Sequence, residues 1–265
     1  MTAPSSLRPD WPAPALVRAA FTLRAGGVSH GRYASLNLGQ HVGDDPLAVA
    51  ENRRRVAGAL QLPAEPLWLA QVHGTTVLNA DAAPRADATR GDHPAPRADA
   101  ALTRQSGRVL AVQVADCLPV LLAARDGSAV AVAHAGWRGL AAGVVEATVA
   151  ALGVGGDQIH AWLGPAIGPA HFEVGEEVRA AFCAPAGEHA GEAAAAFVRN
   201  DRGRWQCDLR LLARQRLSQL GVRSIHGAPR CTYAEADAFY SFRRDASTGR
   251  MAALIWLGEP AQAAC

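Results

Sequence analysis

The sequence predicts an α/β fold, of the α+β type, in which helices are layered on a mixed β-sheet. Short apolar runs rich in valine and bounded by Gly, Asp or Pro recur through the chain, and such runs are typical of buried strands. Longer segments with an apolar stripe and end-capping residues lie between them, which is typical of amphipathic helices. No internal repeat and no linker is evident, so we interpret residues 1–265 as a single domain.

The apolar runs predict strands over residues 17–23, 67–72, 100–103, 109–115, 119–124, 129–134, 159–163, 223–226 and 251–257. The run over 67–72 ends at His73, and the run over 129–134 leads through His134 into a glycine-punctuated turn. Cys117 falls in the break between two strands. Strand ends are where sheet proteins commonly place ligand sites.

Capping residues beside an apolar stripe predict helices over residues 46–60, 140–152, 176–182 and 209–220. Asp45 followed by Pro46 is an N-cap with proline at the first helical position. Asp208 caps the last of these helices, while Gly153 and Gly221 each follow a helix end.

Three segments are expected to lie outside the core. Residues 1–15 are rich in proline and are expected to form a flexible arm. Residues 79–97 combine Ala, Asp, Pro and Arg, which predicts a mobile surface loop. Residues 184–196 are a low-complexity Ala, Gly and Glu segment, expected to be a surface excursion.

The composition excludes several classes of protein. Hydrophobic residues make up 49% of the chain, enough for a sizeable core, and 26 Lys and Arg against 24 Asp and Glu give a net charge of +2. This balance predicts neither nucleic-acid nor membrane-surface binding. No apolar stretch reaches the about 18 residues of a membrane span, and the N-terminus lacks a signal-peptide core. The five cysteines are scattered, which favours a reduced, cytoplasmic protein.

Three short segments each carry one side chain that binds metals well. They are Gln71-Val72-His73-Gly74, Ala115-Asp116-Cys117-Leu118-Pro119 and Ala133-His134-Ala135-Gly136-Trp137-Arg138-Gly139. Two imidazoles and a thiol suit zinc or copper, and three protein ligands leave a fourth position for water or substrate. The segments lie far apart in the chain, so their convergence is an expectation that rests on their strand ends.

Each residue also has a plain structural interpretation. His73 alone would be a histidine hydrogen-bonded to backbone, and Cys117 alone a small buried apolar residue. Asp116 would raise the pKa of a neighbouring free thiol by like charge, whereas a bound metal deprotonates the thiol outright. The Asp-Cys pair therefore fits a metal site better than a bare nucleophile.

Candidate substrate contacts come from two loops. Arg138 follows His134 at a predicted helix start, where amide groups and an arginine favour an anion. Arg24 precedes a glycine pair and is a second candidate for phosphate, while Asn37 and His41 lie in a Gly-, Ser- and Asn-containing loop. The alternative for both arginines is a solvated surface charge.

Taken together, the segments resemble the YfiH-type family, formerly described as multicopper polyphenol oxidases or laccase-domain proteins. Besides the three segments above, the resemblance rests on Thr22-Leu23-Arg24-Ala25-Gly26-Gly27-Val28-Ser29, Ser35-Leu36-Asn37-Leu38-Gly39, Gly164-Pro165-Ala166-Ile167-Gly168-Pro169, Phe172-Glu173-Val174-Gly175, Arg230-Cys231-Thr232 and the stretch from Phe239 to Ala252. It covers residues 17–257. One departure is Ala170-His171-Phe172, where many members carry Cys-Cys-Tyr, and whether His171 contacts the metal stays open.

The resemblance implies a sandwich of mixed sheets between helical layers, with His73, Cys117 and His134 as metal ligands, usually for zinc. It implies a zinc-dependent purine nucleoside phosphorylase that acts on adenosine, inosine, guanosine and methylthioadenosine and also deaminates adenosine. Nucleoside and phosphate would be its partners. The loop residues Arg24, Asn37, His41 and Arg138 would contact them, with Trp137 a candidate for stacking on the base and Glu173 or His41 for carrying a proton.

Three other functions stay open from the sequence. The first is a copper-dependent polyphenol oxidase (laccase), although such enzymes need several coppers and only three ligands are evident. The second is a cysteine hydrolase acting on cell-wall precursors, with Cys117 as nucleophile and His134 as base. The third is a non-catalytic protein, either a scaffold in which a metal clamps three strands or a partner of cell-wall enzymes.

Overall fold

The computed structural model describes residues 3–82, 95–184 and 190–259. Its helices are α1 (Pro46–Leu60), α2 (Trp137–Ala142), α3 (Val144–Leu152), α4 (Glu176–Cys183), α5 (Ala190–Ala194), α6 (Leu209–Gln219) and α7 (Phe242–Asp245). Its strands are β1 (Ser6–Leu7), β2 (Val17–Thr22), β3 (Val77–Asn79), β4 (Ala100–Thr103), β5 (Leu110–Val114), β6 (Leu118–Ala124), β7 (Val130–Ala135), β8 (Ile159–Leu163), β9 (Glu173–Val174), β10 (Phe197–Arg199), β11 (Trp205–Cys207), β12 (Ser224–His226) and β13 (Met251–Leu257). Short 3-10 helices cover Gly31–Tyr33, Gly156–Gln158 and Pro169–His171.

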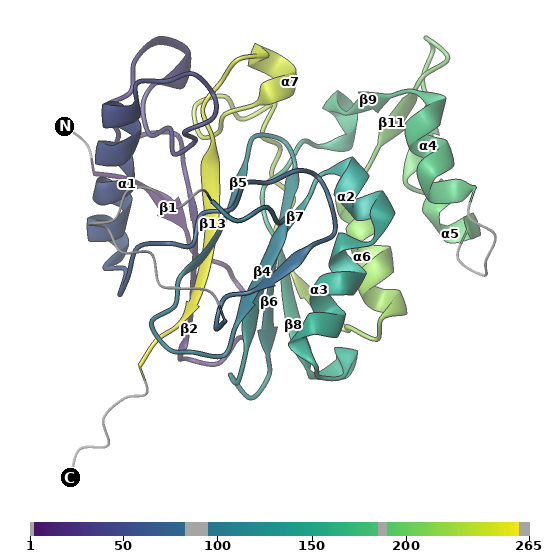
Figure 1. The fold of residues 1–265 in the computed structure, drawn as a ribbon. Coiled ribbons are helices and arrows are strands. Elements are labelled where there is room, and N and C mark those ends of the chain that lie inside the picture. The colour runs from purple at the N-terminus through teal and green to yellow at the C-terminus, as the bar shows by residue number, and fades with distance from the viewer. Residues whose placement is uncertain (1–2, 83–94, 185–189, 260–265) are drawn as a thin grey trace.

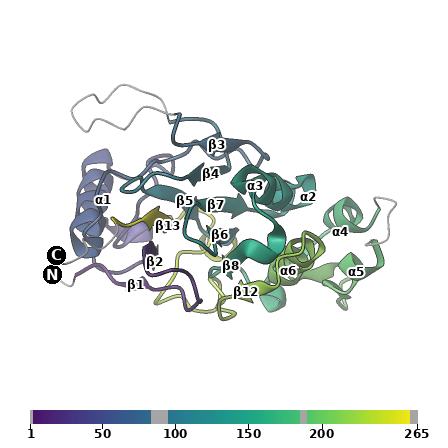
Figure 2. The ribbon, with the colours of Figure 1, turned by 90° about the horizontal axis from the view of Figure 1, so that it is seen from below.

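Two packed β-sheets lie between helical layers. Helix α1 covers a four-stranded sheet of order β1-β2-β13-β5, which packs on a six-stranded sheet of order β12-β8-β6-β7-β4-β3. Helices α2, α3 and α6 cover the far face of the six-stranded sheet (Figures 1 and 2). A three-stranded sheet of order β10-β11-β9 lies beside α4 and α5. The predicted α/β class, with mixed sheets flanked by helices, is confirmed.

Both faces of the six-stranded sheet are buried, which explains why its strands are continuous apolar runs. Along β6, Val120 and Leu122 face the helices, while Leu121 and Ala123 face the other sheet. Strands β6 and β7 pair antiparallel, with Pro119 opposite His134 and Leu118 opposite Ala135. This register brings Cys117, just before β6, next to the C-terminal end of β7. The two ligand segments therefore meet at the same end of these two central strands.

Part of the expected N-terminal arm is ordered, contrary to prediction. Ser6 and Leu7 form β1, which pairs antiparallel with Thr22 and Phe21 of β2. The paired backbone groups are satisfied within the sheet, and Leu7 packs against the core between the two sheets. The proline content of residues 1–15 therefore marks a short edge strand rather than a flexible arm over this stretch.

The strand predicted over residues 67–72 is wrong. Leu67 makes an isolated bridge to Leu110 of the four-stranded sheet, whereas Ala70 makes one to Arg97, next to the six-stranded sheet. The segment crosses from one sheet to the other, so it cannot form a continuous ladder with either. The Gln71 side chain takes the place of a ladder partner, because its Nε2 donates to Gln113 O at 2.8 Å and its Oε1 accepts from Gln113 N at 2.7 Å.

Other boundaries differ in smaller ways. The helix predicted over 140–152 begins earlier, at Trp137, and is divided at Gly143, whose φ of +101° ends α2 and starts α3. Of the surface loop predicted over 79–97, residues 83–94 lie outside the described residues, as do 185–189 of the predicted excursion, which otherwise contains α5. In the part of the chain that is described, no helix combines the length and the apolar character needed to cross a membrane.

Candidate metal centre and substrate cavity

His73, Cys117 and His134 converge where β6 begins and β7 ends, in the middle of the six-stranded sheet. Their ligand atoms all lie within 4.8 Å of one another, and Cys117 Sγ is 3.9 Å from His73 Nε2. His73 comes from the segment that crosses between the sheets, Cys117 precedes β6, and His134 lies near the end of β7. The sequence prediction that these three side chains meet is therefore correct in geometry.

Asp99, which sequence reasoning missed, holds two of the three side chains in place. Its buried carboxylate accepts hydrogen bonds from the backbone N–H groups of Val72, His73 and Gly74 at 3.1, 2.9 and 2.7 Å. It also accepts one from His134 Nδ1 at 2.9 Å, which leaves Nε2 free to bind a metal. Metal-binding histidines are commonly oriented by such a carboxylate. Burial alone would raise the pKa of Asp99, but the hydrogen bonds from His134 and Gly74 N outweigh it and lower the pKa.

The three donors fit a metal with tetrahedral preference. Zinc–nitrogen and zinc–sulfur bonds place neighbouring N and S ligands about 3.5 Å apart, slightly closer than the 3.9 Å between Cys117 Sγ and His73 Nε2. A side chain at Gly136 would fill this space, because an added Cβ would lie 2.9 Å from Cys117 Sγ and 2.9 Å from His73 Cδ2. The described residues contain no other group of three or more His, Cys, Asp or Glu side chains so placed.

Charge favours the thiolate form of Cys117. Burial alone would raise the pKa of this thiol, but His134 and His73 outweigh it and bring the pKa to about 6. Burial likewise would lower the pKa of His134, but Cys117 and Asp99 raise it to about 9. The thiolate is the form of cysteine that binds metals and acts as a nucleophile.

The Asp116 carboxylate does not act on Cys117 as expected. It accepts hydrogen bonds from Thr232 Oγ1 at 2.6 Å, Ser241 Oγ at 3.0 Å and Arg243 N at 2.7 Å. The expected rise in the thiol pKa is therefore wrong, because the effect of His134 and His73 on Cys117 lowers it instead. Asp116 has φ +90° and His73 φ +61°, so backbone strain is concentrated beside the ligands.

The three side chains open onto a cavity of about 410 Å³, which we call the metal-side cavity. Of the predicted substrate contacts, His41 and Arg138 line it, whereas Arg24 and Asn37 do not. Burial, followed by the charges of Arg250 and Arg53, lowers the pKa of His41, which therefore stays neutral at pH 7. The lining residues are His41, Gln71, His73, Gln113, Val114, Ala115, Asp116, Cys117, His134, Trp137, Arg138, Ile167, Phe172, Leu209, Phe242, Arg243 and Arg250.

Each of the arginines in this lining is paired with an aromatic ring rather than with a carboxylate. Arg138 Cζ lies 4.4 Å from the Trp137 ring, Arg243 Cζ 5.2 Å from the Phe172 ring and Arg250 Cζ 5.9 Å from the Phe242 ring. None of the three guanidinium groups forms an ion pair with a carboxylate among the described residues. The cavity lining therefore sets three guanidinium groups against one carboxylate, that of Asp116, which leaves an excess of positive charge.

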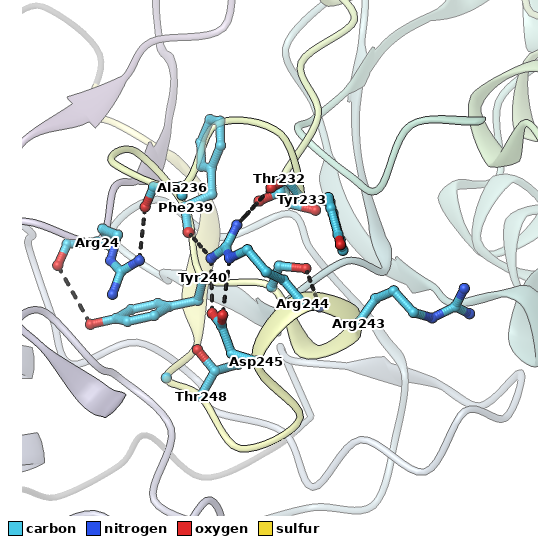
Figure 3. A network of polar contacts seen from close by, with 12 residues as sticks. Arg24, Thr232, Tyr233, Ala236, Phe239, Tyr240, Arg243, Arg244, Asp245 and Thr248 are labelled. Carbon is cyan, nitrogen blue, oxygen red and sulfur yellow. Dashed lines mark hydrogen bonds and ion pairs between the residues drawn. The ribbon is translucent and has the colours of Figure 1, made fainter. Parts of the chain in front are cut away.

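Arg24 has a structural role instead. Its guanidinium donates to Ala34 O at 3.0 and 3.2 Å and to Ala236 O at 2.8 Å, and it lies over the Tyr240 ring (Figure 3). These bonds tie the glycine-rich loop to the C-terminal segment. The sequence could not distinguish this use of an arginine beside a glycine pair from phosphate binding.

Asn37 acts on the cavity only through Arg250. Its Oδ1 accepts from Arg250 N at 2.8 Å and from Gly39 N at 2.9 Å, and the asparagine is fully buried. Two further candidates also lie elsewhere. His171 stacks on Tyr233 at 4.4 Å, and Glu173 binds Asn200 and Arg202 at 2.6 and 2.5 Å. Neither lines the metal-side cavity.

Arg243 and Arg250 are cavity residues that the sequence analysis left without a role. The clearest sequence signal was their place in the resemblance segment from Phe239 to Ala252. The neighbouring Arg244 shows why the presence of an arginine in this segment could not predict that its side chain lines the cavity. It binds the backbone oxygens of Thr232, Tyr233 and Phe239, while Arg243 projects away from that network (Figure 3).

Known proteins are similar to this chain over almost its whole length. Residues 18–258 match the family described as multi-copper polyphenol oxidoreductase laccase. A purine nucleoside phosphorylase of Pseudomonas aeruginosa is 53% identical over 252 residues, covering 95% of this chain and 98% of that protein. The purine nucleoside phosphorylase YfiH of Escherichia coli is 51% identical over 249 residues, covering 94% of this chain and 97% of that protein.

Solved structures agree with these sequence relatives. The Neisseria meningitidis protein NMB0706 superimposes with a TM-score of 0.87 at 48% identity, covering 96% of this chain and 99% of that one. YlmD from Geobacillus stearothermophilus superimposes with a TM-score of 0.88 at 33% identity, covering 98% of each chain. The chain therefore belongs to the multi-copper polyphenol oxidoreductase laccase family, in its YfiH-type branch.

Proposed function

We propose that the protein is a zinc-dependent purine nucleoside phosphorylase. The observation that carries this proposal is the cavity itself, in which a His-Cys-His metal group faces arginines that have no carboxylate partners. Such a cavity suits an anionic co-substrate beside a neutral one. The relatives that are 53% and 51% identical are named as purine nucleoside phosphorylases, which supports nucleoside and phosphate as the pair.

His73, Cys117 and His134 would hold the metal, with Asp99 fixing the His134 tautomer. When bound, zinc supplies a Lewis acid that can stabilise negative charge on an oxygen or nitrogen of the substrate. The donor set supports zinc, because two imidazoles and one thiolate leave a fourth position open. Copper accepts similar ligands, so the metal is itself part of the proposal.

The chain's own residues would bind the substrates and neutralise charge. In phosphorolysis a phosphate oxygen forms a bond to C1′ of the ribose as the C1′–N9 bond breaks. The bonding pair leaves with the purine, which then takes up a proton. Neutral His41 would accept or donate a hydrogen bond to the nucleoside rather than act as an acid. The arginines of the cavity would bind the phosphate, since their planar groups match its oxygens.

The test is a product assay of zinc-loaded protein with inosine, with and without phosphate. We expect hypoxanthine and ribose 1-phosphate only when phosphate is present, and loss of both products in Cys117→Ala protein. Base released at the same rate without phosphate would show hydrolysis and would refute the phosphorylase proposal. Arg24→Gln is the matched arginine control, assayed at a temperature where it is folded.

Adenosine deamination is kept as an additional proposed activity of the same site. Adenosine in place of inosine tests it in the same assay, since deamination produces inosine without phosphate. Of the two candidates for proton carrier, Glu173 and His41, Glu173 is the less favoured, because its carboxylate binds Asn200 and Arg202. Inosine formation that is equal in wild-type and Cys117→Ala protein would exclude this site as its source.

A second candidate function is a cysteine hydrolase. It is favoured by the thiol pKa of about 6 for Cys117 and the imidazole pKa of about 9 for His134, which together describe a thiolate–imidazolium pair. Activity that survives chelation, together with covalent trapping at Cys117, would favour this reaction over zinc chemistry. Fast turnover of phenols by copper-loaded protein would instead favour an oxidase.

A further inference from the structure

We propose that inorganic phosphate binds between Arg138 and Arg243, where the metal-side cavity meets a second, outer hollow of about 270 Å³. The inference rests on the proposed function and names where its anionic substrate binds. Arg138 and Arg243 line both spaces, and so do the aromatic rings that they cover, Trp137 and Phe172. Arg250 lines only the metal-side cavity.

Arg243 is fixed at this passage from both ends. Its backbone N–H donates to Asp116 Oδ2 at 2.7 Å, and its Nη1 donates to Glu173 O at 2.9 Å. Asp116 immediately precedes Cys117, so the same carboxylate links the arginine to the metal ligand segment. With one guanidinium nitrogen bound to a carbonyl, the remaining N–H groups of an exposed side chain are available for an anion.

Arg138 faces the same passage from α2. Its guanidinium makes no hydrogen bond or ion pair to any described residue, and it is positioned by the Trp137 ring alone. Stacking on an aromatic face leaves the N–H edge of a guanidinium free, which is how arginine presents a fork to phosphate. Two such forks that line the same two spaces match a tetrahedral dianion better than either one does.

The carboxylates of the outer hollow do not cancel this charge, because three arginines, Arg138, Arg204 and Arg243, line it with only two glutamates, Glu173 and Glu177. Glu173 is in addition bound by Asn200 at 2.6 Å and by Arg202 at 2.5 Å. With phosphate bound between the two arginines, the metal-side cavity, which includes His41 and Phe242, would remain available for the nucleoside.

The test uses metal-loaded, full-length Arg138→Gln and Arg243→Gln proteins. Loss of one charge-assisted contact predicts that the KM for phosphate rises by about 10-fold to 100-fold, while the KM for inosine changes by less than about 2-fold. Arg223→Gln is the control, because Arg223 is exposed and lines neither space, so both constants should stay unchanged. Zinc content and thermal unfolding would show that each variant is folded.

Direct titration of inorganic phosphate by calorimetry separates this inference from the proposed function. If the wild type lacks phosphorylase activity but binds phosphate, and both variants bind it more weakly, the function fails and the subsite stands. An unchanged affinity for phosphate in both variants would overturn the subsite even if phosphorolysis occurs. A rise in the phosphate KM confined to Arg250→Gln would place the anion in the metal-side cavity and would overturn it as well.

Discussion

At the scale of single residues, a carboxylate outside every recognised motif organises the metal site. Asp99 receives hydrogen bonds from three consecutive amides and from His134, so one side chain sets both the course of the His73 segment and the His134 tautomer. The sequence identified the three ligands because imidazole and thiol groups are rare and chemically distinctive. It could not identify Asp99, because an aspartate before an apolar strand is commonplace until its burial is known.

Replacing Asp99 with Asn should weaken the metal site without removing a ligand. The amide keeps an oxygen for backbone donors but loses the charge that supports His134, so we expect zinc affinity to fall about 10-fold to 100-fold. Competition with a chromophoric chelator measures it. Asp81→Asn is the control, because Asp81 accepts bonds from Thr103 and Arg104 at the other end of β4. Equal losses in both variants would contradict a specific role for Asp99.

Gly136 should tolerate no side chain. A Cβ there would lie 2.9 Å from both Cys117 Sγ and His73 Cδ2, so Gly136→Ala should displace a ligand and reduce bound zinc below one per chain. Gly58→Ala in α1 meets no atom within 4 Å and should keep full zinc. We also expect it to be slightly more stable, since alanine favours a helix. Metal analysis after gel filtration decides the matter, and full occupancy in Gly136→Ala protein would refute the predicted clash.

Thiol reactivity should follow the two different environments of Cys117 and Cys207. Cys117 has a pKa of about 6, whereas burial, followed by Asp208 and Cys183, raises the pKa of Cys207 to about 12. In chelator-treated protein at pH 7, iodoacetamide should therefore label Cys117 and not Cys207. Between pH 7 and pH 5 the Cys117 rate should fall roughly 10-fold as the thiolate is protonated. Mass spectrometry reads the sites, and zinc should protect Cys117.

At the scale of elements, most helices and strands follow from period and capping. The N-cap predicted at Asp45 is present, with Asp45 Oδ1 accepting from Leu47 N at 2.9 Å, and α1 ends at Leu60 as expected. The apolar pattern of residues 67–72 could not exclude a strand, because the pattern does not show that the two bridges of this segment go to different sheets. The burial of Asn52 was equally hidden, since a polar residue on an apolar helix face has no sequence signature.

Asn52 should be a large contributor to the docking of α1. Its Nδ2 lies 2.8 Å from Ser29 Oγ and 2.9 Å from Asn37 O, and its Oδ1 accepts from Val28 N at 2.8 Å. Asn52→Ala leaves these buried groups unsatisfied, so the free energy of unfolding should fall by about 2–4 kcal/mol. Urea denaturation measures it. Glu51→Ala, which removes the ion pairs to the exposed Arg54 and the half-buried Arg55, should change stability less.

At the scale of the whole molecule, the site lies where the segment over residues 67–73 crosses from one sheet to the other. His73 arrives on that segment, Cys117 and His134 on neighbouring strands of one sheet, and Arg243 and Arg250 on the C-terminal chain before β13 of the other sheet. The class of fold was predictable from the apolar runs. The division into two stacked sheets was not, because strands buried on both faces carry no period that says which face meets what.

The central claim is that His73, Cys117 and His134 together bind one metal ion. X-ray absorption at the zinc edge, on protein whose metal content has been measured, tests it most directly. The account predicts one zinc per chain, with one sulfur at about 2.3 Å, two imidazole nitrogens at about 2.0 Å and a light atom in the remaining position. A shell without sulfur, a closed shell of protein ligands, or zinc retained in full by Cys117→Ala protein would contradict it.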